Sequence, residues 1–176
     1  RRWDRTFYYP PELERVVVED FRYDHLFSGL RPLLRRAAEL GDYFIARRWT
    51  EAEPMVVHGD LHEWNVHLYM GRAWAIDFED VMLALPAQDI ATSLYGARTR
   101  PDLPAIIDAF RRGYEEHAEW PVADSVELEV YWAARQVMSM NHAAQVLTEK
   151  AARSYFDQVV PWLRDFMHKT VPATAG

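Results

Sequence analysis

The residues of this chain whose types could do chemistry lie close together, in the stretch VVHGDLHEWNVHLY from Val56 to Tyr69. Three histidines, an aspartate and an asparagine follow a short apolar run there. A second acidic segment, DFED, begins at Asp77. Side chains of these types bind a metal, move a proton or form hydrogen-bonded turns. Which of these uses applies depends on how the surrounding strands and helices position the side chains.

Phosphoryl transfer from a nucleotide is one chemistry that needs this set of side chains. Mg²⁺ takes oxygen ligands from carboxylates and amides and keeps phosphate oxygens as partners. A further carboxylate orients the attacking hydroxyl and takes its proton. Protein kinases supply these groups as His-x-Asp, an Asn five residues after the Asp, and a later Asp-Phe. The same residue types occur here in the same order, at His58, Asp60, Asn65 and Asp77.

The residues around this pattern predict elements that bring its two parts together. The run MVV at 55–57 predicts a short buried strand that leads into the first histidine. After Asn65, two β-prone runs flank residues 70–72 and predict a hairpin, which Asp77 follows directly. Because a hairpin brings its two ends together, we expect Asp60 and Asn65 to lie near Asp77.

The rest of the chain predicts mostly helices. Apolar periodicity and breaker residues predict helices at 28–49, 86–96, 102–120, about 124–147 and about 151–169. Ser28 is placed to cap the first helix, and Asp124 and Glu127 have capping-box spacing. Pro161 should kink or split the last helix. Residues 1–20 predict extended or irregular chain, so the expected fold class is α+β and mostly α-helical.

The stretches HGDLHEWN and IDFED resemble the aminoglycoside phosphotransferase and choline kinase-like group, within the protein-kinase-like fold. The similarity is strong from Val56 to about Tyr95 and extends to the helices that follow. The resemblance implies that Asp60 is the catalytic base. It also implies that Asn65 and Asp77 bind Mg²⁺ and, through it, ATP.

Other residues near the motif take roles from the same resemblance. His58 would be a structural histidine of the catalytic loop, and Asp89 would brace that loop from the next helix. Glu79 stands where protein kinases carry the glycine of Asp-Phe-Gly, and Asp80 is followed closely by the next helix. There is no room for an activation segment, which points to a small-molecule kinase. Glu79 and Asp80 could help to bind metal or substrate. The alternative is that their side chains are solvated or cap a helix.

The same group of kinases places its nucleotide contacts in an N-terminal lobe with a phosphate-pairing lysine. The segment before Val56 does not show five strands and a glycine-rich loop, and its glycines are Gly29 and Gly41. We therefore expect residues 1–176 to form a single domain, equivalent to the C-terminal lobe. An N-terminal lobe or a partner chain would complete the nucleotide site.

The predicted function is ATP- and Mg²⁺-dependent transfer of phosphate to a hydroxyl of a small molecule. The expected acceptor is an amino sugar, an amino alcohol or a similar cationic or polyol compound. This expectation rests on the acidic residues after Pro101, which could attract a cationic acceptor. The alternative is that these residues only form a solvated helical surface. They are Asp102, Asp108, Glu115, Glu116, Glu119, Asp124, Glu127 and Glu129.

Two other classes of protein stay open at this point. One is a kinase-like remnant that binds ligands without turnover. The other is a metal-dependent hydrolase, because His58, Asp60 and His62 alternate and would share one face of an extended segment. Such a site needs further ligands, and the later histidines have no metal-binding motif around them.

Several prominent side chains have a packing role as the simpler interpretation. We expect His62 to pack within the loop and His67 to lie on a strand surface. Trp64 is expected to be a packing residue. The pair Tyr131 and Trp132 predicts core, although aromatic cages do bind quaternary ammonium groups.

Composition narrows the choice of partners and location. A hydrophobic content of 49% with 14% aromatics predicts a globular protein. The formal net charge of −7 argues against nucleic acid or an anionic membrane as a partner. Without cysteine there can be no disulfide and no cysteine-based zinc site. The N-terminal residues lack the apolar core of a signal peptide, so a cytoplasmic location is expected.

Overall fold

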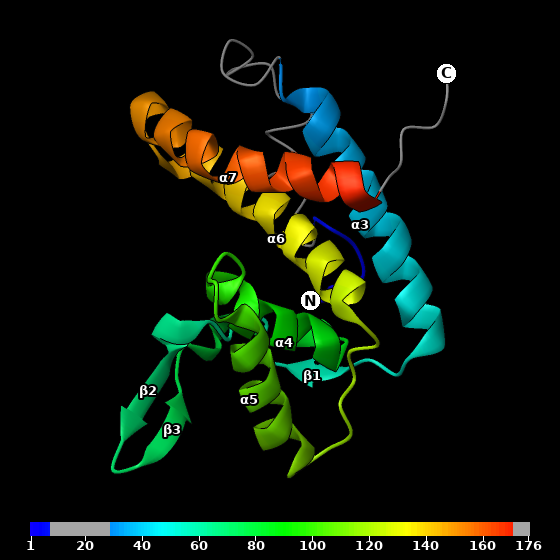
Figure 1. Cartoon of the computed structure of the whole chain (residues 1–176), viewed down its shortest axis with the longest axis vertical. Coiled ribbons are helices and arrows are strands. Elements are labelled where there is room, and N and C mark those ends of the chain that lie inside the picture. Colours follow the sequence, from blue (N-terminus) through cyan, green and yellow to red (C-terminus); the bar gives the residue numbers. More distant parts are fainter. Residues whose placement is uncertain (8–28, 171–176) are drawn as a thin grey trace.

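The computed structural model describes residues 1–7 and 29–170, and Figure 1 shows the arrangement of their elements. These residues are mostly helical, with two small antiparallel β-pairs. The helices are α3 (Arg31–Glu51), α4 (Pro86–Leu94), α5 (Leu103–Glu115), α6 (Ser125–Val146) and α7 (Glu149–Thr170). The strands are β1 (Met55–Val57), β2 (Val66–Tyr69), β3 (Arg72–Ala75) and β4 (Met82–Ala84). The expected α+β, mostly helical class is confirmed.

The two β-pairs frame the polar stretch. β1 pairs antiparallel with β4, with Val56 opposite Leu83, and β2 pairs antiparallel with β3. The predicted strand at 55–57 and the predicted hairpin are therefore confirmed, and the hairpin projects from the body of the molecule (Figure 1). The expected burial of the strand is wrong for Met55 and Val56, which are 53% and 68% exposed; Val57 is buried. Residues 1–3 lie beside β4, where Arg2 forms an isolated parallel bridge with Leu83. Residues 8–20 of the predicted irregular opening lie outside the described residues.

Helix α6 is the central element of the helical part. It packs against α3, α4 and α7, as Figure 1 shows. One apolar cluster joins α3, α6 and α7 and includes Leu34 and Leu163, each 0% exposed. A second cluster joins α4 and α6 and includes Tyr131 and Trp132. Both aromatics are buried, so the core interpretation of this pair is confirmed.

The predicted cap of the first helix and the predicted break of the last helix differ from the structure. Helix α3 begins at Arg31 with Leu30 at its N-cap and no side-chain cap, so the proposed cap at Ser28 is wrong; Ser28 itself lies outside the described residues. Helix α7 runs continuously through Pro161, so the predicted split is wrong. Pro161 and Asp157 are both exposed. The carbonyl that loses its hydrogen bond to the proline therefore faces solvent, which lowers the cost of the missing N–H.

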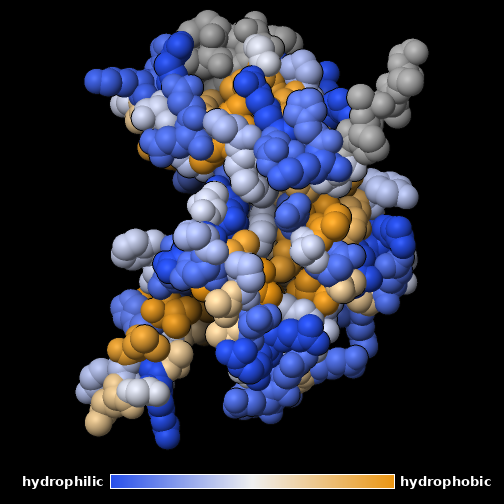
Figure 2. Space-filling model, viewed as in Figure 1, coloured by the Kyte–Doolittle hydropathy of each residue, from blue (hydrophilic) through white to orange (hydrophobic). Residues whose placement is uncertain are grey.

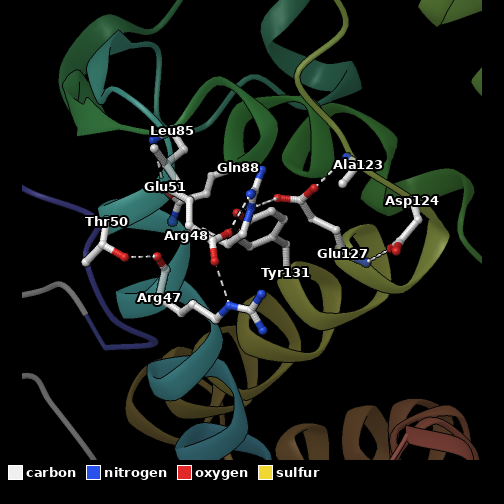
Figure 3. Close-up of polar contacts among 10 residues, drawn as sticks. All are labelled: Arg47, Arg48, Thr50, Glu51, Leu85, Gln88, Ala123, Asp124, Glu127 and Tyr131. Atoms are coloured by element: carbon white, nitrogen blue, oxygen red, sulfur yellow. Dashed lines mark hydrogen bonds and ion pairs between the residues drawn. The ribbon is translucent and has the colours of Figure 1, made fainter.

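A buried polar network ties α6 to α3 (Figure 3). Glu127 is 2% exposed, and its carboxylate accepts hydrogen bonds from Arg48 Nε at 2.8 Å and the Tyr131 hydroxyl at 3.1 Å. The predicted cap at Asp124 is confirmed, because its side chain accepts the N–H of Glu127 at 2.9 Å. The capping box is not completed, since Glu127 accepts the N–H of Ala123 at 2.6 Å and not that of Asp124.

The electrostatics of this network favour the charged form of Arg48. Burial lowers the pKa of Arg48, but its hydrogen bonds to Glu51 and Glu127 outweigh burial and raise it overall. A buried carboxylate with a fixed cation and several donors is stable only while all partners are present.

No helix among the described residues has both the length and the apolar character needed to cross a bilayer.

Candidate active site

The stretch that contains Asp60 is a tight loop that leaves β1 and passes close to the DFED segment. Gly59 has φ +85°, which side chains other than glycine rarely adopt. A β-carbon on Gly59 would overlap the carbonyl oxygen of Asp80 and lie 2.8 Å from the Met82 methyl. Glycine at this position therefore lets two backbone segments touch. The sequence analysis assigned no role to Gly59, because nothing local signals this long-range approach.

Asp89 holds this loop from helix α4. Its two carboxylate oxygens accept the N–H of His58 at 3.1 Å and the N–H of Gly59 at 3.0 Å. Ser93, one turn further along α4, donates its hydroxyl to the carbonyl of Leu61 at 2.7 Å. Burial raises the pKa of Asp89, and the two N–H donors oppose that shift. These two hydrogen bonds join α4 to the backbone of the loop.

Both ring nitrogens of His58 are used within the loop. Nδ1 accepts the N–H of Asp60 at 3.3 Å, so Nε2 carries the proton and donates to the carbonyl of Ile76 at 2.8 Å. The ring also lies 4.7 Å from the ring of Phe78. His58 thus links the loop to the segment after β3 and has no nitrogen left for a metal.

These contacts oppose the alternative of a histidine-metal hydrolase. The loop turns at its glycine, so His58 and His62 do not share the face of an extended strand. His62 Nδ1 accepts the N–H of Trp64 at 3.2 Å. Across residues 1–7 and 29–170, no group of three His, Cys, Asp or Glu side chains is arranged to hold a metal ion.

The hairpin brings Asn65 and Asp77 together, as the sequence predicted. The carbonyl of Asn65 accepts the N–H of Ile76, the residue before Asp77, at 3.0 Å. Asn65 is 7% exposed, and its Nδ2 donates to the carbonyl of Asp60 at 2.9 Å, which leaves its amide oxygen for another partner. Asp77 is exposed and has φ 63° and ψ 65°. A non-glycine residue in this left-handed region stores strain, which is common where a side chain must be aimed for function.

The Asp60 carboxylate lies at one end of a groove of about 370 Å³. The groove is lined by Asp60, Glu79, Asp80, Arg135, Met138, Ser139 and His142. Asp60 Oδ1 lies 2.5 Å from Arg135 Nη2, and Asp60 Oδ2 lies 3.3 Å from His62 Nε2. The sequence analysis missed Arg135. An arginine in the middle of an otherwise apolar helical run was the available signal for it.

The remaining predicted side chains lie as follows. Glu79 is exposed, and Asp80 forms an ion pair with Arg1. Neither caps a helix, because the short 3₁₀ turn at Phe78–Asp80 has Asp77 at its N-cap position without a side-chain hydrogen bond.

Two of the three packing interpretations need correction. His67 is exposed on β2, as expected for a strand surface. Trp64 is 78% exposed, so its interpretation as a packing residue is wrong for the described chain. His62 does pack in the loop, but it also contacts Asp60 directly.

The acidic residues that motivated a cationic acceptor lie away from this groove. None of them is among the described residues that line it. Asp108 and Asp124 line a different hollow, and Glu127 is buried in the network with Arg48. The acidic balance after Pro101 therefore gives no structural support to a cationic acceptor.

A large apolar surface is exposed beside the loop. It covers the hairpin and the segment after it, and Figure 2 shows apolar side chains along the projecting hairpin. Its largest exposed members include Leu68, Tyr69, Met70, Trp74 and Phe78, at 54–84% exposure. Contiguous exposed apolar surface of this kind marks a place where other protein packs.

Comparison with known proteins agrees with the fold and the motif. The profile of the phosphotransferase enzyme family (APH) matches residues 3–126. The chain belongs to this family. It also resembles two crystal structures of thermostable mutants of the aminoglycoside phosphotransferase APH(4)-Ia. One is a ternary complex with AMP-PNP and hygromycin B (17% identity, TM-score 0.52), and the other is the apo form (18% identity, TM-score 0.50).

The extent of these matches is uneven. Both structural matches cover 92% of this chain, but only 51% and 52% of the solved chains. The chain thus spans about half the length of the structures it resembles. At such low identity the likeness describes the fold, which is about half of a kinase-like phosphotransferase. No curated protein matches the chain in sequence.

Proposed function

We propose that this chain carries the catalytic loop of an ATP-dependent phosphotransferase that acts on a hydroxyl of a small molecule. The observation that supports this most is the convergence of Asp60, Asn65 and Asp77 on two backbone segments that touch each other. A proton acceptor and two oxygen donors for a cation are the groups that phosphoryl transfer requires. Membership of the phosphotransferase family supports the same reaction class.

The residues present suit Mg²⁺. Asn65 offers an amide oxygen and Asp77 an exposed carboxylate, which are hard oxygen donors. Mg²⁺ keeps several waters and phosphate oxygens, so it does not need a closed cage of protein ligands. When bound, the ion would neutralise charge on the phosphates of ATP. The left-handed backbone at Asp77 would fix the direction of that carboxylate relative to Asn65.

Asp60 would act on the acceptor. Its carboxylate borders the groove, so an acceptor hydroxyl there would donate a hydrogen bond to it and lose its proton as the phosphoryl group arrives. Asp89 and His58 fix the loop backbone that leads into Asp60, through the N–H groups of residues 58–60. Their role would be to keep that carboxylate within hydrogen-bonding reach of the hydroxyl, where small displacements are costly.

The partners follow from the same proposal. One of the matched structures is described as bound to AMP-PNP and hygromycin B, which suits ATP as donor and a hydroxyl-rich sugar as acceptor. An N-terminal lobe or a partner chain would supply the remaining nucleotide contacts. It would also cover the apolar hairpin surface, for which the partial coverage of the matched structures is the supporting observation.

The test is Asp60→Asn in the complete encoded protein. The substitution keeps the shape and removes the base, so turnover should fall by roughly 10²–10⁴-fold. ADP release with Mg²⁺ and a panel of amino sugars, amino alcohols and neutral polyols measures it. Asp102→Asn is the matched control, because Asp102 is also paired with an arginine, at 2.8 Å, but on the surface. Wild-type turnover by Asp60→Asn would remove the assignment of Asp60.

A further inference from the structure

Arg135 makes a close contact with the reactive carboxylate from a distant part of the chain. Its Nη2 lies 2.5 Å from Asp60 Oδ1, across 75 positions of sequence. The two side chains are 16% and 30% exposed, so this pair is partly shielded from water. Charge-assisted hydrogen bonds of this length are stronger and more directional than neutral ones.

The helix that carries Arg135, α6, is packed against three other helices. Its neighbours Ala134 and Gln136 are 1% and 0% exposed, and the helix packs on α3, α4 and α7. The other contact to the Asp60 carboxylate comes from His62, which belongs to the same loop as Asp60. The hydrogen bond from Arg135 therefore connects the Asp60 carboxylate to the helical core.

The guanidinium of Arg135 is itself positioned by aromatic and acidic neighbours. It lies over the ring of Tyr95, 5.5 Å from the centroid, and Tyr95 is fixed by its hydroxyl, which donates to Gln136 Oε1 at 2.6 Å. The charge of Arg135 also acts on Asp89, whose pKa it lowers against the larger effect of burial. Arg135 thus interacts both with Asp60 in the loop and with Asp89, which contacts the loop from α4.

We propose that Arg135 is a positioning residue, which holds the Asp60 carboxylate in the orientation that the acceptor hydroxyl meets in the groove. This inference rests on the proposed function, because it assigns Arg135 a role through Asp60. A planar guanidinium fixes a carboxylate by direction as well as by charge, which a lysine ammonium does not. Arg135 holds Oδ1 of this carboxylate and His62 Nε2 lies 3.3 Å from Oδ2, so the acceptor hydroxyl would meet a carboxylate whose orientation is set by Arg135.

The test is a double-mutant cycle in the complete encoded protein, with Asp60→Asn, Arg135→Gln and their combination. Arg135→Gln should lower kcat roughly 10–100-fold, the cost of a displaced catalytic group, with acceptor KM little changed. Since Arg135 acts through Asp60, the double variant should be within about threefold of Asp60→Asn. Arg135→Lys keeps the charge without the planar group and should restore part of the kcat.

The matched control is Arg111→Gln. Arg111 also pairs with a carboxylate, Glu115 at 2.7 Å, and lies 6.0 Å from the centroid of the Trp120 ring, but it is exposed on α5. This control should keep the wild-type kcat. Thermal unfolding of each variant measures the folded fraction. If Arg135→Gln does not fold, the cycle is run with Arg135→Lys, for which the same non-additivity is expected.

The outcomes separate this inference from the proposed function. A slow Asp60→Asn with an unchanged or faster Arg135→Gln overturns the positioning role alone. Multiplicative losses in the double variant also overturn it, since they mean that Arg135 acts independently of Asp60. A fully active Asp60→Asn removes the base itself, and the positioning role with it. A non-additive cycle with partial rescue by lysine supports the proposal.

Discussion

The helical part of this molecule and the part around the loop of Asp60 are held together in different ways. The helices bury large apolar clusters, in which side chains such as Leu34 and Leu163 are 0% exposed. Among the residues that the structure describes, the loop region has a small cluster of Trp3, Val57, Met82 and Ala84. What holds the loop instead is a small number of polar contacts, chiefly those of Asp89 and His58.

Because of this difference, substitutions in the two parts should affect stability and activity differently. Apolar burial is non-directional and sums over many contacts, so it stabilises the fold without fixing single atoms. Hydrogen bonds from rigid elements fix direction, which catalysis by positioned groups requires. Substitutions in the helical part should therefore change stability more than kcat, and substitutions in the loop anchors should change both.

The largest expected effect on stability is in the helical part, at Glu127. Glu127→Ala leaves Arg48 and the Tyr131 hydroxyl without their shared acceptor, and breaking a buried pair in this way costs about 3–5 kcal/mol. Chemical denaturation measures the free energy of unfolding. Glu115→Ala is the control, since it breaks an exposed pair with Arg111 and should change little. Equal effects of the two variants would contradict the buried network.

The next effect is at Gly59, where the loop meets the DFED segment. Gly59→Ala combines a left-handed backbone, φ +85°, with overlap of the Asp80 carbonyl, so it should cost at least about 2 kcal/mol. It should also lower kcat, because Asp60 is the next residue. Gly71→Ala is the matched control, with φ +73° and open space around it. It should cost about 1 kcal/mol and leave kcat unchanged. Similar losses in both would mean that close approach does not matter.

A smaller effect is expected for Asp89→Asn. Asparagine offers one acceptor oxygen where two N–H groups need one each, which should cost about 1–3 kcal/mol. Turnover should fall as well, because the N–H groups of His58 and Gly59 lose a shared anchor. Unfolding and ADP release measured on the same samples separate the two effects. Loss of stability with unchanged kcat would contradict the view that this contact positions Asp60.

The pH dependence of the Asp89 variant has a definite sign. Burial raises the pKa of Asp89 from its ordinary 3.8, so the ionised form is less favoured in the folded chain than in the unfolded chain. Its contribution to stability is present below the unfolded pKa and is lost as pH rises through the raised folded pKa. The stability difference between wild type and Asp89→Asn should therefore narrow as pH rises from below the ordinary pKa of 3.8 through the raised folded pKa of Asp89. Parallel pH profiles would contradict it.

The smallest effect is at the start of α6. Asp124→Ala removes the side-chain acceptor of the Glu127 N–H and should cost about 1 kcal/mol without changing kcat. Asp102→Ala is the control, because Asp102 holds the same position on α5 but makes no side-chain cap hydrogen bond. Thermal melts of both variants give the comparison. A larger shift for Asp102→Ala would show that the cap is not the cause.

The sequence by itself determined the local features of this protein. The short strand, the hairpin and most helices follow from backbone preferences and apolar periodicity, which act over a few residues. The spacing of His58, Asp60, Asn65 and Asp77 identified the family for the same reason, because a loop and a hairpin place these residues without help from the rest of the chain. Helix ends were less certain, as the missing cap at Ser28 shows.

Only the tertiary structure decided which distant residues meet the loop. The approach of Arg135 to Asp60 and the burial of Glu127 against Arg48 depend on how α6 packs on its neighbours. The need for glycine at Gly59 depends on where the Asp80 carbonyl lies. Packing angles and registers between helices are set by many weak contacts summed over whole surfaces. No short pattern of residues encodes such sums, so these contacts could not be predicted from the sequence.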